Sequence, residues 1–423
     1  MSGYESWDWN KGKKTPADIG GITGRFESIN ELAASPDGER LAVVGVNGEN
    51  AHVICVNGED LPNTFELAWY LRYGPGGSLI CLVRIDDEWT LAENGEPWEE
   101  RFEYAWNPVF SGDGKSVAML IKRDMEYGVA HNGRVWEQKF AGIRDFAISS
   151  DGTQVAATVQ VESLAEADVF KFFEGVWSVA VNGRPWEGRY VNAWNPIFSS
   201  DGKLVAAEVR TDICDYTIGI NGQLWQDSYG GVWQPCFRPG GSRVVAPVRH
   251  EGSWTLYEDG RPLWKNRFMQ LWLPVMCPGG KRVAAQACPE FGLWTIVVDD
   301  QPWKNRFRDM VLAPTFSGDS SRVAAVVKDN DRYTIAVDDR LWPEWFDMIW
   351  EPCFAPDGGQ VAAKAQRGEK FAVVLDGRPS RREFEKLWEP VFAPDGKHLL
   401  LRYIENGHYV REVVSTAEVL GQA

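Results

Sequence analysis

The sequence predicts an all-β protein, a β-propeller of about ten four-stranded blades. Three observations support this prediction. A unit of 37 to 40 residues repeats along the chain, each copy has the composition of four short strands, and most tryptophans recur at fixed positions in the unit. Repeats of this length that consist only of short strands are typical of propellers, in which each repeat forms one blade.

The repeat is defined by the frame W-x-P-x-F-S-x-D-G, followed by small and β-branched residues. Its clearest copies begin at Trp106, Trp194 and Trp388. The fourth copy is longer: its turn lies 50 residues before the next one, against 37 to 40 residues elsewhere. The tight-turn pair of the frame occurs ten times, at Asp37-Gly38, Gly76-Gly77, Asp113-Gly114, Asp151-Gly152, Asp201-Gly202, Gly240-Gly241, Gly279-Gly280, Asp319-Ser320, Asp357-Gly358 and Asp395-Gly396.

Four strands are expected in each copy. The first is short and apolar and begins with proline, as at residues 108–110, where no ladder donor is lost. The second follows the Asp-Gly turn and is rich in β-branched residues, as at 117–121. The third alternates large and small residues, as at 177–181, and ends in an Asn-Gly turn. The fourth begins at the next tryptophan.

The tryptophans follow the same period. Of 21 indoles, 18 fall in three series: seven precede the first strand, seven follow the second turn, and four open the third strand. A position that recurs in every blade is expected to pack between neighbouring sheets, so we predict that these series form the core. An indole platform for a sugar or a peptide is the alternative.

The ring is expected to be single. Propellers have about 4 to 8 blades, so two smaller rings in tandem are the alternative to one ring of ten. Two rings would need extra residues between two blades, and the spacing shows none. We therefore assign residues 29–423 to one propeller. Residues 1–28 either donate a strand that closes the ring or form a tail.

Charge and hydropathy exclude several classes of protein. With 60 acidic and 44 basic residues the net charge is -16, which repels a phosphate backbone, so no nucleic-acid partner is expected. No apolar segment is long enough for a direct membrane span, and the N-terminal segment lacks the apolar stretch of a secretory signal peptide. We expect a soluble cytoplasmic chain. Its seven cysteines form no C-x-x-C pair, so free thiols are expected.

No motif for catalysis or for cofactor binding occurs. The sequence lacks a G-x-S-x-G elbow, a Walker loop, H-E-x-x-H, and haem or iron–sulfur patterns. The five histidines have no ligand spacing. We therefore predict no catalytic, cofactor-binding or metal-binding residues, no cofactor and no enzyme activity. The recurring aspartates, such as Asp113 and Asp201, fall in the same turn of each copy, and turn chemistry accounts for them.

Contacts with partners are expected where a copy departs from the shared frame, because the frame itself is used for folding. The insertion in the fourth copy is one such departure. This insertion is either a docking element or a surface loop without a binding role. Its apolar candidates are Leu164, Val169, Phe170, Phe172 and Phe173.

Two further departures are candidates for docking. The ninth copy has a serine in place of the tryptophan that follows the second turn, beside Arg378, Arg381 and Arg382. This basic spot fits an acidic partner, and a solvated charge cluster is the alternative. Trp7 and Trp9 lie in a polar segment outside the repeats, where they either await a partner or pack on the last blade.

The turn segments at 35–38 (Ser-Pro-Asp-Gly) and 393–396 (Ala-Pro-Asp-Gly) resemble the WD40-like repeats of TolB-type propellers. No Gly-His pair and no Trp-Asp pair recurs at the blade ends, as such pairs do in true WD40 repeats. More narrowly, the tryptophan content, the W-x-P-x-F opening and the Trp-Lys-Asn-Arg-Phe sequence at 264–268 and 303–307 are similar to one family. That family is the tryptophan-rich subunit (TmcD) of the Tmc transmembrane redox complex of sulfate-reducing bacteria.

The second resemblance implies a cofactor-free scaffold subunit of a membrane-bound electron-transfer complex. Its partners would be iron–sulfur, membrane and multihaem cytochrome subunits. The chain would then be peripheral on the cytoplasmic side of the inner membrane, held there by those partners. The resemblance carries over no functional residue. A stand-alone propeller that binds a peptide or a glycan is the alternative.

Overall fold

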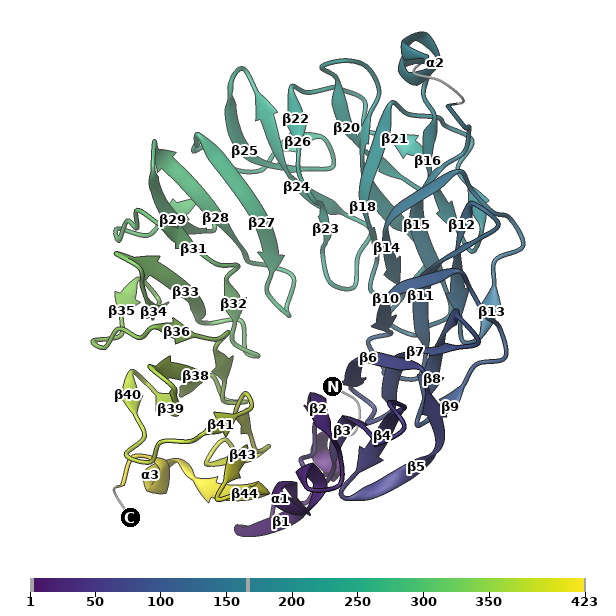
Figure 1. The fold of residues 1–423 in the computed structure, drawn as a ribbon. Helices are drawn as coiled ribbons and strands as arrows, with labels where there is room; N and C mark the ends of the chain where they lie inside the picture. Colours follow the sequence, from purple (N-terminus) through teal and green to yellow (C-terminus); the bar gives the residue numbers. More distant parts are fainter. Residues whose placement is uncertain (1–3, 165–167, 422–423) are drawn as a thin grey trace.

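The computed structural model describes residues 4–164 and 168–421, and these form one ring of ten antiparallel blades (Figure 1). The predicted fold class and the predicted single ring are confirmed. In the first nine blades the strands follow the chain from the inside of the ring to its outer edge, and in the tenth the outermost strand comes from the N-terminal segment. All seven cysteines are free thiols. None of the helices in the described residues has the length and apolar character needed to cross a membrane.

Six blades have an unbroken inner strand. Blade 1 contains β2 (Ser28–Ala34), β3 (Leu41–Val46), β4 (His52–Val56) and β5 (Glu59–Phe65). Blade 2 contains β6 (Leu67–Tyr73), β7 (Leu79–Ile85), β8 (Glu88–Glu93) and β9 (Glu96–Pro97). Blade 3 contains β10 (Tyr104–Phe110), β11 (Val117–Arg123), β12 (Glu126–His131) and β13 (Arg134–Val135).

Blades 4, 5 and 7 complete this group. Blade 4 contains β14 (Gly142–Ile148), β15 (Val155–Gln160), β16 (Trp177–Val181) and β17 (Arg184–Pro185). Blade 5 contains β18 (Asn192–Phe198), β19 (Val205–Arg210), β20 (Tyr216–Ile220) and β21 (Gln223–Leu224). Blade 7 contains β27 (Gln270–Met276), β28 (Val283–Glu290), β29 (Leu293–Val298) and β30 (Gln301–Pro302).

In the other blades the inner strand is divided in two on either side of the proline of the frame. In blades 3, 5 and 7 the strand continues through the same proline with a shift of register. Blade 6 contains β22 (Gly231–Val232), β23 (Cys236–Phe237), β24 (Val244–His250), β25 (Ser253–Glu258) and β26 (Arg261–Pro262). Blade 8 contains β31 (Met310–Val311), β32 (Thr315–Phe316), β33 (Val323–Asp329), β34 (Arg332–Val337) and β35 (Arg340–Leu341). Blade 9 contains β36 (Met348–Ile349), β37 (Cys353–Phe354), β38 (Val361–Arg367), β39 (Lys370–Leu375) and β40 (Arg378–Pro379).

The tenth blade joins both ends of the described chain. Its strands are β41 (Lys386–Leu387), β42 (Val391–Phe392), β43 (His398–Glu405), β44 (His408–Ser415) and the N-terminal β1 (Gly12–Asp18). Strand β1 pairs antiparallel with β44 and is the outermost strand of this blade. The ring is therefore closed by a strand from the first residues. The helical segments are η1 (Tyr4–Ser6), α1 (Ile19–Thr23), α2 (Val169–Glu174) and α3 (Thr416–Val419).

The Asp-Gly turns bring neighbouring blades together. In the third blade, Ser111 Oγ donates to Asp113 Oδ1 over 2.6 Å, and the same oxygen accepts the Lys115 N–H over 3.0 Å. Gly114 has φ +71°, and a Cβ there would overlap the backbone nitrogen of Gly76 in the preceding blade. The structure thus places the recurring aspartates in the turns for which they were predicted.

The tryptophan that follows the second turn packs between two blades, as predicted for the core. Trp136 contacts Val129 of its own blade and Val155 of the next. The turn glycine of the next blade, Gly183, lies against its indole, and a Cβ there would be 3.4 Å from the ring. Trp264, Trp303 and Trp342 are buried in the same way.

The core prediction is wrong for Trp69 and Trp233, two of the seven tryptophans that precede the first strand. Trp69 is 39% exposed and Trp233 is 42% exposed, because the first strand faces the inside of the ring. Each of these seven indoles packs instead on an aromatic ring of the third strand of its own blade. The pairs are Trp69–Trp89, Trp106–Tyr127, Trp194–Tyr216, Trp233–Trp254, Trp272–Trp294, Trp350–Phe371 and Trp388–Tyr409.

Candidate functional site

The ring has two distinct faces. Alternate strands of a blade run antiparallel, so the hairpins between second and third strands share one face with the connections to the next blade. We call this the hairpin face. The Asp-Gly and Asn-Gly turns share the opposite face, which we call the turn face. The hairpins of the hairpin face are residues 47–51, 86–87, 124–125, 161–176, 211–215, 251–252, 291–292, 330–331, 368–369 and 406–407.

Exposed apolar side chains gather near the hairpin face. In the part of the chain that the structure describes, 17 large apolar side chains are exposed. Six lie in the hairpins: Met125, Val169, Phe170, Phe173, Ile213 and Phe291. Nine lie at or near the beginning of an inner strand: Leu67, Trp69, Tyr104, Trp233, Met269, Leu273, Met310, Leu312 and Met348. The remaining two, Leu224 and Leu341, lie on outer strands.

The hairpins are also acidic. Their described residues include twelve acidic side chains and one basic side chain, Lys171. The hairpin face therefore combines negative charge with exposed apolar side chains. The acidic residues are Glu49, Asp86, Asp87, Asp124, Glu162, Asp168, Glu174, Asp212, Asp215, Glu251, Asp331 and Glu369.

The insertion of the fourth blade projects from the hairpin face. It forms the short helix α2, whose N-terminus is capped by Asp168: its Oδ1 accepts the Lys171 N–H over 3.0 Å. Phe170 is 85% exposed, and Val169 and Phe173 are exposed beside it. Leu164 and Phe172 are half-buried. Residues 165–167 of the predicted docking element lie outside the described residues.

The three arginines of the ninth copy do not form a free basic spot. Arg382 donates to Glu405 over 2.6 Å and to Glu412 over 2.8 Å, so two carboxylates of the last blade balance its charge. The Arg382 Nη2 atom that donates to Glu405 also donates to the Tyr403 hydroxyl over 2.5 Å. Arg378 and Arg381 are exposed. The structure thus commits Arg382 to packing between blades 9 and 10.

Trp7 and Trp9 lie on the turn face. Their rings stack 5.8 Å apart, and Trp9 Nε1 donates to the Tyr4 carbonyl over 3.1 Å. Both indoles are half-buried. Trp7 lines a pocket together with Pro36 and Pro75, which belong to the turns between the first and second strands of blades 1 and 2. The sequence-predicted docking residues are therefore divided between opposite faces.

Sequence reasoning missed a buried carboxylate on the inner side of blade 5. Glu208 lies on β19 opposite Trp194 and is 4% exposed. Asn195 Nδ2 donates to its Oε1 over 2.7 Å. Burial raises the pKa of Glu208 to about 7; the Asn195 hydrogen bond lowers it, and the charge of nearby Asp145 raises it further. This carboxyl can therefore change its protonation state near neutral pH.

Indoles from two further blades form the walls around this carboxyl. A pocket of about 310 Å³ is lined by Asn195, Glu208, Trp233, Gln234, Trp272 and Leu273. Trp233 is held by stacking on Trp254, with ring centroids 5.4 Å apart and planes 12° apart. Trp272 packs on Trp294, and their ring centroids lie 4.7 Å apart. We call this the Glu208 pocket.

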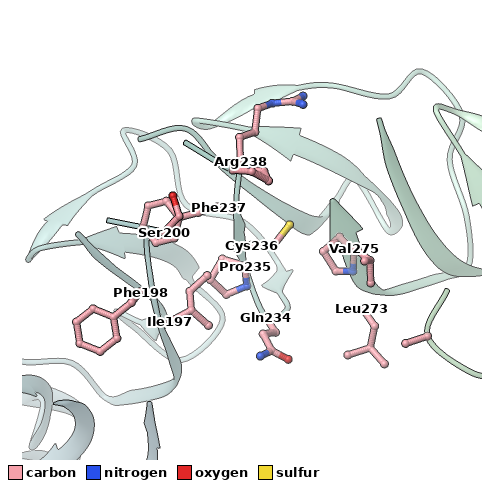
Figure 2. Close-up of a pocket in the computed structure, with 13 residues that line it drawn as sticks. Ile197, Phe198, Ser200, Gln234, Pro235, Cys236, Phe237, Arg238, Leu273 and Val275 are labelled. Carbon is pink, nitrogen blue, oxygen red and sulfur yellow. The ribbon is translucent and has the colours of Figure 1, made fainter. Parts of the chain in front are cut away.

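Two more pockets adjoin the Glu208 pocket. One, of about 450 Å³, shares Glu208 and Trp233 with it and has the exposed Arg249 on its wall. The other, also of about 450 Å³, shares Gln234 and Leu273 and is lined by Pro235, Cys236 and Val275 (Figure 2). Burial raises the pKa of the Cys236 thiol to about 12, so it stays protonated at neutral pH. In the described residues, no group of three or more His, Cys, Asp or Glu side chains is placed to hold a metal ion.

A comparison of the ten copies at one position would have found Glu208. Five of the ten second strands carry an apolar residue there, four carry a neutral polar or a basic residue, and one carries an acid. The residues at this position are Val44, Leu82, Leu120, Thr158, Glu208, Pro247, Gln286, Val326, Lys364 and Arg402.

The fold defines the class of protein as a β-propeller. No family model and no curated protein matches the sequence. Among solved structures, a eukaryotic initiation factor is similar, with 13% identity, a TM-score of 0.48, and coverage of 81% of this chain and 94% of that chain. The Dos1 propeller has 10% identity, a TM-score of 0.35 and 94% coverage of both chains. The Cps50 (Swd1) propeller domain of Myceliophteria thermophila has 11% identity, a TM-score of 0.30, and coverage of 65% and 99%.

Proposed function

We propose that the chain is a non-enzymatic interaction subunit and that a partner protein docks on the hairpin face. One observation carries this proposal: 15 of the 17 exposed large apolar side chains lie in the hairpins or near the beginning of inner strands. Exposed apolar side chains scattered singly are ordinary, whereas their concentration on one side of a molecule marks an interaction surface.

The charge of the hairpins indicates the chemistry of the partner. Twelve acidic side chains against one basic side chain favour a surface with basic groups around an apolar centre. Such complementarity accelerates association and disfavours acidic competitors. Phe170, at the tip of the insertion, is placed to act as an anchor because most of its ring is exposed.

The narrower proposal concerns the identity of the partners. They are the iron–sulfur, membrane and multihaem cytochrome subunits of a transmembrane redox complex, and the chain is a cofactor-free peripheral subunit on the cytoplasmic side of the inner membrane. The support for this is the resemblance of the tryptophan-rich repeat to the TmcD family. The acidic hairpin face is compatible with these partners, but it would fit other basic partners as well.

A second candidate function is the binding of a ligand inside the ring by a stand-alone propeller. The Glu208 pocket favours it, because two indoles and a buried carboxylate converge there. A peptide or a glycan was the expectation from the sequence. Trp233 and Leu273 adjoin both surfaces, so docking is tested with residues of the hairpins and ligand binding with Glu208.

Docking is tested with two matched double variants. Tagged Phe170→Ser/Phe291→Ser removes two exposed rings from the hairpin face, whereas Leu224→Ser/Leu341→Ser removes the two exposed leucines of the outer strands. After mild detergent extraction of native membranes, we expect the first variant to retain about tenfold less partner protein than wild type, and the second to retain it fully. Equal losses would refute the docking face. Captured material without haem or iron–sulfur absorbance would refute the narrower proposal alone.

A further inference from the structure

We propose that the Glu208 pocket binds a monovalent organic cation, a primary or methylated ammonium group. The charge of the cation would meet the Glu208 carboxylate, and its alkyl part would lie against Trp233 and Trp272. This site is separate from the hairpins that carry the proposed docking function. It follows from four features of the pocket, taken in turn below.

The first feature is a buried carboxylate that has no cationic partner among the residues that the structure describes. Glu208 is 4% exposed, and its hydrogen-bond partner is the neutral amide of Asn195. The charged neighbour that affects it is Asp145, which has the same sign. Buried carboxylates are normally paired with a cation, because burial of an isolated charge is costly. The fold thus leaves a place for a positive charge.

The second feature is an example of the same recognition within the chain. In blade 9, Lys364 occupies the second-strand position that Glu208 occupies in blade 5. Its Nζ lies 3.9 Å from the centroid of the Trp350 ring and 3.2 Å from Glu389 Oε1. An inner-strand indole and a carboxylate therefore hold an ammonium group in blade 9. In the Glu208 pocket the indoles and the carboxylate are present, and the ammonium would come from a ligand.

The third feature is the preorganisation of the indoles. Trp233 is stacked on Trp254, and Trp272 packs on Trp294, so neither wall has to be ordered when a ligand enters. Trp is the best side chain for cation–π attraction, which is strengthened where water is excluded. Preformed aromatic walls around an acidic group are the usual way to recognise alkylated ammonium groups.

The fourth feature is size and charge selection. A volume of about 310 Å³ accommodates a small alkylammonium group. The exposed Arg249 on the wall of the adjoining pocket repels a second positive charge. The site therefore favours a monoamine over a diamine of similar length.

The test is a titration of the full chain with n-butylammonium and tetramethylammonium chloride at pH 8, followed by calorimetry and indole fluorescence. Sodium chloride at matched ionic strength is the reference. We expect saturable binding to wild type and binding weaker by about tenfold or more in Glu208→Gln. Gln286 occupies this position in blade 7 and Leu120 in blade 3, so Glu208→Gln and Glu208→Leu both fit the fold. The control is Glu369→Gln, in an exposed hairpin.

The source of the cation is a free amine or the lysine of a partner protein. Titration with Nα-acetyl-lysine methylamide separates them: tighter binding than n-butylammonium identifies a protein side chain, and weaker binding identifies a free amine. The proposal is overturned if no amine binds saturably to wild type, or if Glu208→Gln binds amines as wild type does. Amine binding that persists in Phe170→Ser/Phe291→Ser shows that this site and the docking face are independent.

Discussion

Arg411 of the last blade donates a hydrogen bond from Nε to the backbone carbonyl of Asp37, in the first blade, over 2.8 Å. Its side chain is 1% exposed and also pairs with Glu39 over 3.0 Å. A second nitrogen of the guanidinium bonds the carbonyl of Asp8 in the N-terminal segment. One side chain thus joins three segments at the place where the ring closes, and Tyr409 adds a bond to the Gly38 carbonyl over 3.1 Å.

We expect Arg411→Met to destabilise the ring by about 2–4 kcal/mol, because it removes a buried guanidinium that bonds two part-buried carbonyls and a carboxylate, while keeping the aliphatic stem. Urea unfolding measures the change. Arg378→Met is the control: Arg378 is exposed, and its loss is expected to change the free energy of unfolding by less than about 0.5 kcal/mol. Equal effects of the two substitutions would show that the closure contact contributes nothing special.

Gly114 and Gly292 form a matched pair for the contact between blades. Their φ angles are +71° and +72°, so an alanine is strained to the same degree at both positions, by about 1 kcal/mol. A Cβ at Gly114 overlaps Gly76 of the neighbouring blade, whereas a Cβ at Gly292 meets nothing within 4 Å. We expect Gly114→Ala to lower the free energy of unfolding by roughly 1–3 kcal/mol more than Gly292→Ala, and therefore to lower the melting temperature further. Similar melting temperatures would contradict a tight contact between the turns.

Glu208 makes stability depend on pH. Its pKa is raised from 4.5 to about 7 in the folded chain. The folded state therefore holds the proton more tightly, and the stability from this group is present below pH 4.5 and is lost as pH rises towards 7. Relative to Glu208→Gln, wild type should lose on the order of 3 kcal/mol across this range. Urea unfolding of both proteins at several pH values measures this loss of stability. If the two proteins show the same dependence of stability on pH, the Glu208 carboxyl is solvated rather than buried.

The aspartates of the turns respond in the opposite direction. Ser317 Oγ donates to Asp319 Oδ1 over 2.5 Å, and this bond is the largest cause that lowers the Asp319 pKa to about 2. Its contribution to stability is therefore present above pH 3.8 and is lost as pH falls towards 2. We expect Ser317→Ala to raise the Asp319 pKa towards 3.8, measured by NMR titration of the carboxyl groups. The pKa of Asp201, lowered by Ser199, should stay unchanged in the same sample.

The fold could be predicted because its signals are local. Turn pairs such as Asp113-Gly114, strand alternation and a fixed period all lie within one copy of the repeat. The exposure of Trp69 and Trp233 could not be predicted in this way. The exposure of these indoles depends on which strand of the blade faces the inside of the ring. The composition of the four strands does not reveal their order from the inside of the ring to its edge. The same periodicity is compatible with a buried or a half-exposed indole.

The candidate sites were less predictable because they combine residues from several blades. Glu208, Trp233 and Trp272 come from blades 5, 6 and 7, and no spacing rule relates them. Arg382 looked like a free cation because its partners, Glu405 and Glu412, belong to the next blade. The insertion with Phe170 was found because an interruption of a repeat is visible without any knowledge of packing.

Strand β1 depends on a partner that is synthesised much later. Asp18 pairs with His408, so 390 residues separate the two sides of this ladder. At about 5–20 residues per second, the ribosome needs roughly 20 to 80 seconds to supply β44. During that time β1 is an unpaired edge, and Lys13, Lys14 and Pro16 are the residue types that keep such an edge from joining a wrong sheet. The ladder that closes the ring therefore cannot form until the last strand of the chain has been synthesised.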